Sequence, residues 1–202
     1  LSIIILFTLS FNATSHVGHY AEFNYLEYDL FRNNKLIGNH KFNFTRENDL
    51  LNVKSDVNFK ITKLGVDIYK YSAKSEEIYK NGKFFKFSST TNQNKKQKYV
   101  NIIVDPSEKE LKIDGSSYKG NSSIDAVVGT WWNHEIVKAK KQISAISGRI
   151  IEQKVIFVGK EQIEISGKTY DAIHFKFKSS DENLPDNKKL NIDVWYDEKT
   201  FL

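Results

Sequence analysis

The stretch KLIGNHKFNFTR, from Lys35 to Arg46, alternates apolar and polar residues with a period of two. In an extended chain this alternation places the apolar side chains on one face, which is typical of a β-strand with one buried side. The residues on that face are Leu36, His40, Phe42 and Phe44. The pattern recurs at 51–61, where the inward residues would be Leu51, Val53, Val57, Phe59 and Ile61. The sequence therefore predicts a fold built from long amphipathic strands.

Compact turn signals separate these strands. They are Asn33-Asn34, Glu47-Asn48-Asp49, Lys63-Leu64-Gly65 and Asn81-Gly82. Such short links suit antiparallel hairpins, because a parallel crossover needs a dozen or more residues. Further strands are predicted at 66–79, 83–91, 98–105, 110–113, 152–158, 161–165, 169–178 and 190–196. We therefore predict a mainly β fold with a single curved antiparallel sheet, a half-barrel, in one domain.

One segment, at about 124–146, lacks the period of two. It contains GTWWNHEIVK, from Gly129 to Lys138, with two of the three tryptophans of the chain. Apolar residues recur there at roughly helical spacing, which predicts a short helical insert. These residues are Trp131, Ile136, Ala139 and Ile143.

The start of the chain resembles a secretory signal. LSIIILFTLSFNATS is an apolar run followed by small residues, and Ala13 and Ser15 occupy the −3 and −1 positions of a cleavage site. We expect a signal peptide at 1–15 whose start is missing, then a β-rich domain at 16–202 whose C-terminus is truncated, exported to the periplasm. A buried N-terminal strand is the alternative. The chain has no cysteine, which excludes disulfides and acylation through a lipobox.

The positive charge of the chain is carried almost entirely by lysine. The formal net charge is +5, and the only arginines are Arg32, Arg46 and Arg149. Nucleic-acid sites favour the planar, bidentate guanidinium of arginine, so we predict no nucleic-acid partner. The dense run at 94–98 predicts a solvated loop, with attraction to an anionic membrane face as the sharper alternative. Peripheral membrane contact therefore stays open.

The His134-Glu135 pair resembles half of a zinc-protease motif. That motif needs a second histidine one helical turn later, and Lys138 occupies its place. The chain also lacks a G-x-S-x-G elbow, a G-x-G-x-x-G loop and a P-loop. We therefore predict no catalytic residue, no metal site and no cofactor. A pair of glycosidase-like carboxylates stays open, with Glu77 and Asp193 as the candidates.

The tryptophans suggest a binding site instead. We predict that Trp131 and Trp132 form an aromatic lid over the mouth of the curved sheet, with His134 and Glu135 at its polar rim. Plain core packing is the alternative, because each tryptophan can bury about 200 Å². Trp195 is expected to be largely buried in the closing strand. The predicted ligand-binding residues are Trp131, Trp132, His134, Phe42, Phe44, Phe59 and Trp195.

Several short motifs occur in a fixed order along the chain. They are Leu36-Ile37-Gly38-Asn39-His40, Lys63-Leu64-Gly65-Val66, Tyr69-Lys70-Tyr71, the run 76–84, Trp131-Trp132-Asn133, Ser147-Gly148-Arg149 and the run 193–197. This order resembles a family of exported proteobacterial proteins of unknown function, over about 22–202. That family is similar at the fold level to the Lol-type lipoprotein carriers, in which a curved sheet partly closed by short helices covers an apolar cavity. The resemblance implies an architecture and an apolar ligand, such as an acyl chain, and no activity.

Three functions compete at this point. Predicted export, amphipathic strands, 13% aromatic residues and the lack of a catalytic motif favour a periplasmic binding or carrier domain for an apolar or lipid-like ligand. Such a domain would not be an enzyme, and a cell-envelope protein would be a further partner. The alternatives are a periplasmic enzyme acting on cell-envelope glycans and an outer-membrane β-barrel. The lysine-rich polar faces favour a water-facing exterior over the barrel.

Overall fold

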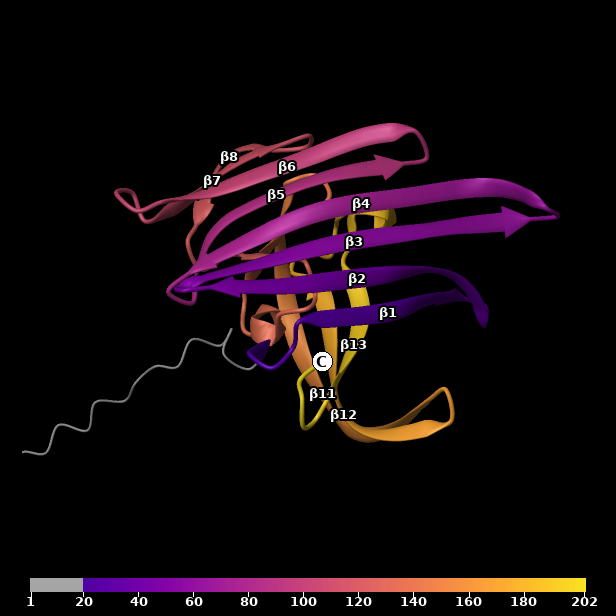
Figure 1. The fold of residues 1–202 in the computed structure, drawn as a ribbon. Helices are drawn as coiled ribbons and strands as arrows, with labels where there is room; N and C mark the ends of the chain where they lie inside the picture. The colour runs from indigo at the N-terminus through magenta and orange to yellow at the C-terminus, as the bar shows by residue number, and fades with distance from the viewer. Residues whose placement is uncertain (1–19) are drawn as a thin grey trace, which may run out of the picture.

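The computed structural model describes residues 20–202, and the signal peptide predicted at 1–15 lies outside them. Eight strands form one antiparallel sheet, in which every strand pairs with its neighbour along the chain (Figure 1). In chain order they are β1 (Tyr25–Arg32), β2 (Lys35–Glu47), β3 (Leu50–Lys63), β4 (Val66–Lys80), β5 (Lys83–Gln93), β6 (Lys96–Asp105), β7 (Glu110–Gly115) and β8 (Lys119–Ser123). The predicted hairpin connections are therefore confirmed.

The turns between these strands explain the meander. Two-residue hairpin turns of type I′ need a positive φ at both central residues, which asparagine and glycine tolerate best. Asn33 and Asn34 have φ of 50° and 58°, and the Asn81-Gly82 turn has 50° and 71°. Leu64 is an exception, because a leucine occupies the left-handed region there with φ of 50°.

The rest of the chain forms a second sheet of five strands, in the order β13-β12-β11-β10-β9. They are β9 (Val127–Val128), β10 (Lys141–Ile143), β11 (Ile150–Ile165), β12 (Lys168–Ser179) and β13 (Asn191–Asp197). β9 and β10 pair in parallel, and the other pairs are antiparallel. The two strands predicted at 152–158 and 161–165 are one strand, β11, with a register shift between Phe157 and Gly159.

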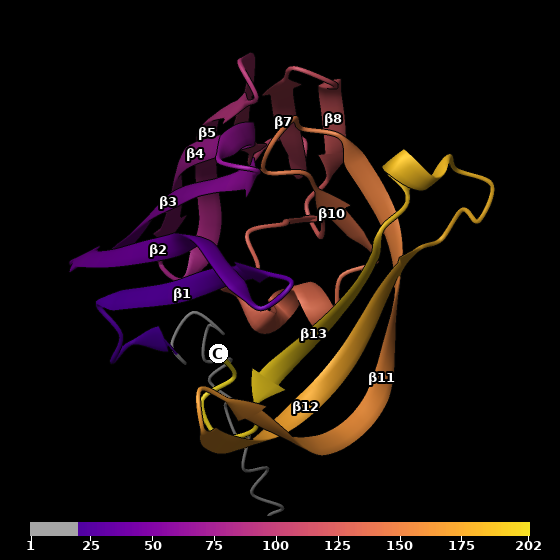
Figure 2. The ribbon, with the colours of Figure 1, turned by 90° about the vertical axis from the view of Figure 1, so that its right-hand side faces the viewer.

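The two sheets correct the prediction of a single sheet, while the mainly β class and the large curved antiparallel sheet are confirmed. The strands of the second sheet cross those of the first in Figure 1. In Figure 2 the eight-stranded sheet curves along one side of the molecule and β11–β13 along the other. Within residues 20–202, neither sheet closes on itself, and β1 and β13 are edge strands.

The helical insert predicted at about 124–146 is wrong. This segment contains β9, β10 and a single turn of 3-10 helix, η2 (His134–Val137). The apparent helical spacing arises because successive apolar residues enter different buried clusters: Ile136 contacts the β12 side, and Ile143 contacts the β5–β7 side. A second short 3-10 turn, η3 (Asp186–Lys188), precedes β13. No helix in the described residues is long and apolar enough to cross a membrane.

Three clusters of buried side chains fill the space between the sheets. The first joins β5–β7 to the 126–143 segment through Phe87, Val100, Ile102, Leu111, Ile113, Ala126, Val128 and Ile143. The second joins β2–β4 to the 130–134 segment through Tyr20, Phe42, Phe44, Leu51, Val53, Tyr79 and Trp132. The third contains Ile136, Phe177 and Leu190, with Trp131 and Val194 among the residues packed against them.

Candidate functional site: an aromatic pocket between the sheets

The Trp131-Trp132 pair joins two of the buried clusters. Trp131 has φ of 67°, a left-handed conformation that is rare for a bulky residue. The two indoles consequently enter different clusters. Trp132 is 2% exposed, and Phe44 and Tyr79 contact it edge to face, with ring centroids 5.4 and 5.9 Å away. Trp131 packs edge to face on Phe177 of the second sheet, at 5.2 Å.

A buried carboxylate holds this segment against the eight-stranded sheet. Glu77 of β4 is 3% exposed and accepts three hydrogen bonds. Its Oε2 accepts from Trp132 Nε1 at 2.9 Å and from Thr130 Oγ1 at 3.1 Å, and its Oε1 accepts from the Tyr79 hydroxyl at 2.5 Å. Burial raises the pKa of Glu77, and the three donors oppose that shift by stabilising the carboxylate.

His134 lies inside the fold and not at a polar rim. Its Nδ1 is 2.8 Å from the hydroxyl of Tyr20, which also accepts a hydrogen bond from the backbone N–H of His134 at 3.1 Å. Burial raises the pKa of Tyr20 to about 12. The neighbouring Glu135 forms an ion pair with Lys138 at 3.0 Å. The residues expected at the polar rim therefore have structural contacts.

A small pocket lies between the two sheets, where the edge strands β1 and β13 face each other. Its volume is about 170 Å³. The lining residues are Tyr28, His40, Phe42, Trp131, Trp132, Val194, Trp195, Tyr196 and Leu202. Six of these nine residues are phenylalanine, tyrosine or tryptophan, and all three tryptophans of the chain are among them, with Trp195 at the exposed margin. A dry, apolar cavity of about 150 Å³ is large enough to bind benzene.

Two polar side chains give the pocket its chemistry. Tyr196 is 3% exposed, and its buried hydroxyl has no hydrogen-bond partner among residues 20–202. Leaving such a group unpaired costs about 1–3 kcal/mol. His40 contacts Ser55 Oγ through Nε2 at 2.8 Å, and its ring is tilted by 36° against that of Phe42, with the centroids 4.1 Å apart. Burial lowers the pKa of His40 to about 4, so its imidazole is neutral at pH 7.

Burial also raises the pKa of the Tyr196 phenol, so its hydroxyl keeps its proton at neutral pH. The pocket therefore offers a hydrogen-bond donor and a neutral imidazole within aromatic walls. Taking a charged group into such surroundings is costly, because the pocket provides no opposite charge. The arrangement favours an uncharged, largely apolar group with one hydrogen-bond acceptor.

The pocket collects four of the seven predicted binding residues, namely Phe42, Trp131, Trp132 and Trp195. Phe44 and His134 lie in the adjoining core. Phe59 lies elsewhere: its ring stacks on that of Tyr71 at 4.9 Å, and both residues line a separate depression. A gating role for Trp131 and Trp132 stays a prediction.

The expected burial of Trp195 is wrong, because this residue is 39% exposed. The period of two in β13 turns Val194 and Tyr196 toward the interior and leaves Trp195 facing outward. Its indole stacks on His174 at 4.2 Å, and its Nε1 donates to Glu161 Oε1 at 2.6 Å. The buried aromatic of this strand is Tyr196.

Sequence reasoning placed His40 on the inward face of its strand and missed Tyr28, Tyr196 and Leu202. His40 and Tyr28 are direct partners in the β1–β2 ladder, so a correct pairing of that hairpin would have found Tyr28. Tyr196 could have been found from the alternation of β13, if Val194 had been placed inside. No sequence pattern indicates that Leu202 lines the pocket.

The structure does not bring the two candidate carboxylates together. Glu77 lies in the interior with Trp132, whereas Asp193 lies on the outer face of β13. Asp193 contacts His174 Nε2 at 2.9 Å and Lys176 Nζ at 2.8 Å. The hydrogen bonds from Lys176 and His174 lower the pKa of Asp193. These residues therefore cannot act as one acid and base pair.

A comparison with models of protein families assigns the chain to a family. The model of a domain of unknown function, DUF6134, matches residues 28–202. The chain belongs to the DUF6134 family. The DUF6134 domain runs from β1 through β13 and includes every residue of the pocket. Comparisons with curated proteins and with solved structures give no match.

This assignment confirms the predicted membership of a domain family of unknown function. The proteobacterial origin and the likeness to Lol-type carriers stay predictions.

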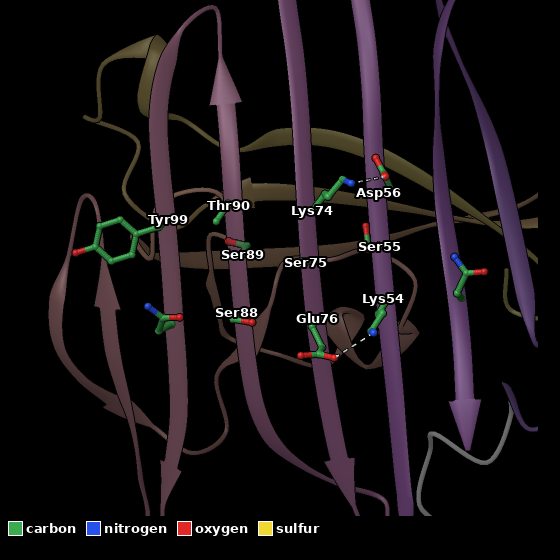
Figure 3. A pocket seen from close by; sticks show the side chains of 12 residues that line it. Lys54, Ser55, Asp56, Lys74, Ser75, Glu76, Ser88, Ser89, Thr90 and Tyr99 are labelled. Atoms are coloured by element: carbon green, nitrogen blue, oxygen red, sulfur yellow. Dashed lines mark ion pairs between the residues drawn. The ribbon is translucent and has the colours of Figure 1, made fainter. Parts of the chain in front are cut away.

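The outer face of the eight-stranded sheet in this DUF6134 domain carries a wider, shallow depression of about 630 Å³ (Figure 3). Its side chains are polar and cross strands β2–β6. Two ion pairs lie across it, Lys54 with Glu76 at 3.8 Å and Lys74 with Asp56 at 3.7 Å. These lysines are largely exposed, and ion pairs on the surface contribute little to the stability of a fold. The aromatic pocket between the sheets is the stronger candidate.

Proposed function

We propose that this DUF6134 domain is a binding or carrier domain for an apolar ligand, which inserts a ring-sized group into the pocket between the sheets. The observation that carries the proposal is the Tyr196 hydroxyl, buried without a partner among residues 20–202 in the wall of an aromatic pocket. A ligand with one acceptor would supply the missing hydrogen bond and remove its energetic cost.

The volume of the pocket limits what it can hold. Pockets that enclose a whole small molecule usually measure about 300–1,000 Å³, whereas this one measures about 170 Å³. A complete acyl chain therefore does not fit. The ligand would place one end or one ring inside and leave its remainder at the seam between β1 and β13.

The edge strands supply the route to the pocket. Tyr28 comes from β1 and Val194 from β13, and these strands do not pair with each other. Side-chain motion at this seam can admit a ligand without breaking a backbone ladder. Entry at the seam also suits a carrier, because the ligand can leave by the same route.

Binding of two small probes tests this function. Acetophenone and ethylbenzene are similar in size, and only acetophenone carries a hydrogen-bond acceptor. We expect acetophenone to change the intrinsic tryptophan emission in a saturable way, because all three tryptophans line the pocket. Ethylbenzene should bind about tenfold more weakly, since it leaves the Tyr196 hydroxyl unpaired.

The Tyr196→Phe variant is the matched control. It keeps the ring and removes the hydroxyl, so the preference for acetophenone over ethylbenzene should disappear while urea unfolding shows an intact fold. If neither probe gives saturable emission changes with the wild-type chain, the proposed binding function fails.

The proposed location is the periplasm. It is supported by the apolar run and the small residues at positions 13 and 15 of the sequence. Expression behind an added initiator methionine and a short basic segment should yield a protein cleaved after Ser15 in the periplasmic fraction. Recovery of the uncleaved chain in the cytoplasm would contradict this location.

A further inference from the structure

Hairpin turns alternate between the two ends of the eight-stranded antiparallel meander, so the β1–β2, β3–β4, β5–β6 and β7–β8 turns share one end. Figure 1 shows the first three of these tips together at the right of the sheet, with the β3–β4 hairpin extending farthest. The three segments 31–36, 60–70 and 93–98 are together called the hairpin end.

The hairpin end exposes large apolar side chains. Leu64, at the β3–β4 turn, is 95% exposed. Phe31, Leu36, Val66 and Ile68 are each more than half exposed. A leucine at a left-handed turn position gains no packing and is conformationally less favourable than asparagine or glycine. The stability of the fold therefore does not explain Leu64.

The same end concentrates the positive charge of the chain. Its basic residues are Arg32, Lys35, Lys60, Lys63, Lys70, Lys95, Lys96 and Lys98, and its one acidic residue is Asp67. Eight positive charges and one negative charge give +7, whereas the whole chain carries +5. The remainder of the chain consequently sums to −2. The positive balance of the protein resides at this end.

An open depression of about 770 Å³ lies behind the tips. Phe59 and Tyr71 contribute aromatic surface to it. Its three lysines, Lys60, Lys70 and Lys95, outnumber its one carboxylate, Asp67, which pairs with Lys60 and Lys70 at 3.9 and 3.1 Å. Anionic phosphate groups and nearby acyl carbons would both find matching surface there.

We propose that the hairpin end docks on an anionic lipid membrane, with Leu64 inserted among the headgroups and the lysines beside the lipid phosphates. Apolar side chains on separate tips, flanked by lysines, suit a soft lipid interface, where each tip can insert independently. The charge is complementary to an anionic lipid surface. This docking does not depend on the ligand proposed for the pocket.

Vesicle sedimentation of the full chain tests the docking. We expect the protein to sediment with vesicles of phosphatidylcholine and phosphatidylglycerol in a ratio of about 7:3 and to stay in solution with phosphatidylcholine alone. Sodium chloride at about 0.5 M should release it, because salt screens surface attraction. Leu64→Asn should weaken binding about tenfold without lowering stability, since asparagine suits the left-handed turn.

Matched variants at the opposite end of the sheet control for general effects. Leu50→Asn replaces another exposed leucine and is the control for Leu64→Asn. The charge variant of the hairpin end is the double change Lys95→Glu with Lys96→Glu. Its control at the opposite end is Lys83→Glu with Lys109→Glu, which changes the net charge by the same amount. Only the variants of the hairpin end should weaken binding. Equal losses in both sets, or equal binding to both vesicle types, would overturn the proposal.

Two further measurements distinguish lipid docking from binding to an acidic protein and from binding in the pocket. Retention on immobilised polyglutamate without any vesicle binding would assign the hairpin end to an acidic protein and would also overturn the proposal. Leu64→Asn should leave the acetophenone titration unchanged, because Leu64 does not line the pocket. Failure of docking and failure of pocket binding are thereby distinguishable.

Discussion

Two tryptophans of this chain each donate the indole N–H to a glutamate, one inside the fold and one on its surface. Trp132 donates to Glu77 at 2.9 Å, and Trp195 donates to Glu161 at 2.6 Å. The first pair lies between the sheets, whereas Trp195 is 39% exposed on the outer face of the second sheet. The two contacts are similar in geometry and differ in their access to water.

This difference sets the energetic weight of each contact. On the surface, water replaces either partner when the contact is lost, so such a bond contributes little. In the interior no water replaces Glu77, and Trp132, Thr130 and Tyr79 would all lose their acceptor. Distance alone therefore does not rank the two pairs.

Truncation of Trp132 should have the largest effect. Trp132→Ala removes an indole that contacts Phe44 and Tyr79, and the cavity left behind adds to the cost. We expect the free energy of unfolding to fall by about 3–5 kcal/mol. Urea unfolding followed by circular dichroism measures it. A loss below about 1 kcal/mol would remove the distinction between the two tryptophans.

Removal of the buried carboxylate should have the second largest effect on stability. Glu77→Ala leaves three buried donors without their acceptor, and we expect a loss of about 3 kcal/mol. Glu161→Ala is the surface counterpart and should cost less than about 1 kcal/mol. Both variants can be compared in one series of urea titrations at pH 7. Equal losses would show that burial does not decide the weight of these contacts.

Acidification should lower the free energy of unfolding through the buried His40. Burial lowers the pKa of His40 from 6.5 to about 4, with the negative charge of Asp56 opposing the shift. At pH 7 the imidazole is neutral in both the folded and the unfolded chain, so its ionisation does not affect the free energy of unfolding at that pH. As pH falls from about 6.5 to 4 the unfolded chain takes up the proton first, and stability declines by about 2–3 kcal/mol.

The variant His40→Gln isolates this titration, because glutamine can still bond Ser55 and does not ionise. The difference in unfolding free energy between wild type and variant should change across that pH range. A difference that stays constant from pH 7 to pH 4 would place His40 in water.

The smallest effect is expected at the surface tryptophan. Trp195→Ala should change the free energy of unfolding by no more than about 1 kcal/mol, because much of the indole is already in water. The emission maximum of the remaining two tryptophans should shift to shorter wavelength. A destabilisation as large as that of Trp132→Ala would mean that stacking on His174 matters far more than its exposure indicates.

The eight-stranded sheet could be predicted because its information is local. Alternation at 35–46 and 51–61 defines the strands, and short turns between them define the pairing. The second sheet depends on distant contacts: Gln142 pairs with Val127 in a parallel ladder that no turn signal indicates. The segment between them resembled a helix because its apolar residues enter separate clusters on both sides.

The pocket was only partly predictable for a related reason. Phe42 follows from the alternation of β2, and the Trp131-Trp132 pair stands out by composition. The position of Trp195 between Val194 and Tyr196 in the closing strand predicts its burial, although its two neighbours occupy the inward positions. A short alternating strand has two registers, and only the packing of the opposite sheet chooses between them. The unpaired hydroxyl of Tyr196 is a property of three-dimensional packing and has no sequence signal.

The meander has a consequence for the order of folding. Each of its hairpins can close between neighbours in the chain, so the eight-stranded sheet requires few long-range encounters. The hydrogen bond from Trp132 to Glu77 joins residues that are 55 positions apart, so it forms only after the segment with Trp132 has docked on the sheet. That docking also requires the positive φ of Trp131. We expect the rate-limiting step to be this docking, and the free hairpins to form a dynamic, partly ordered sheet before it.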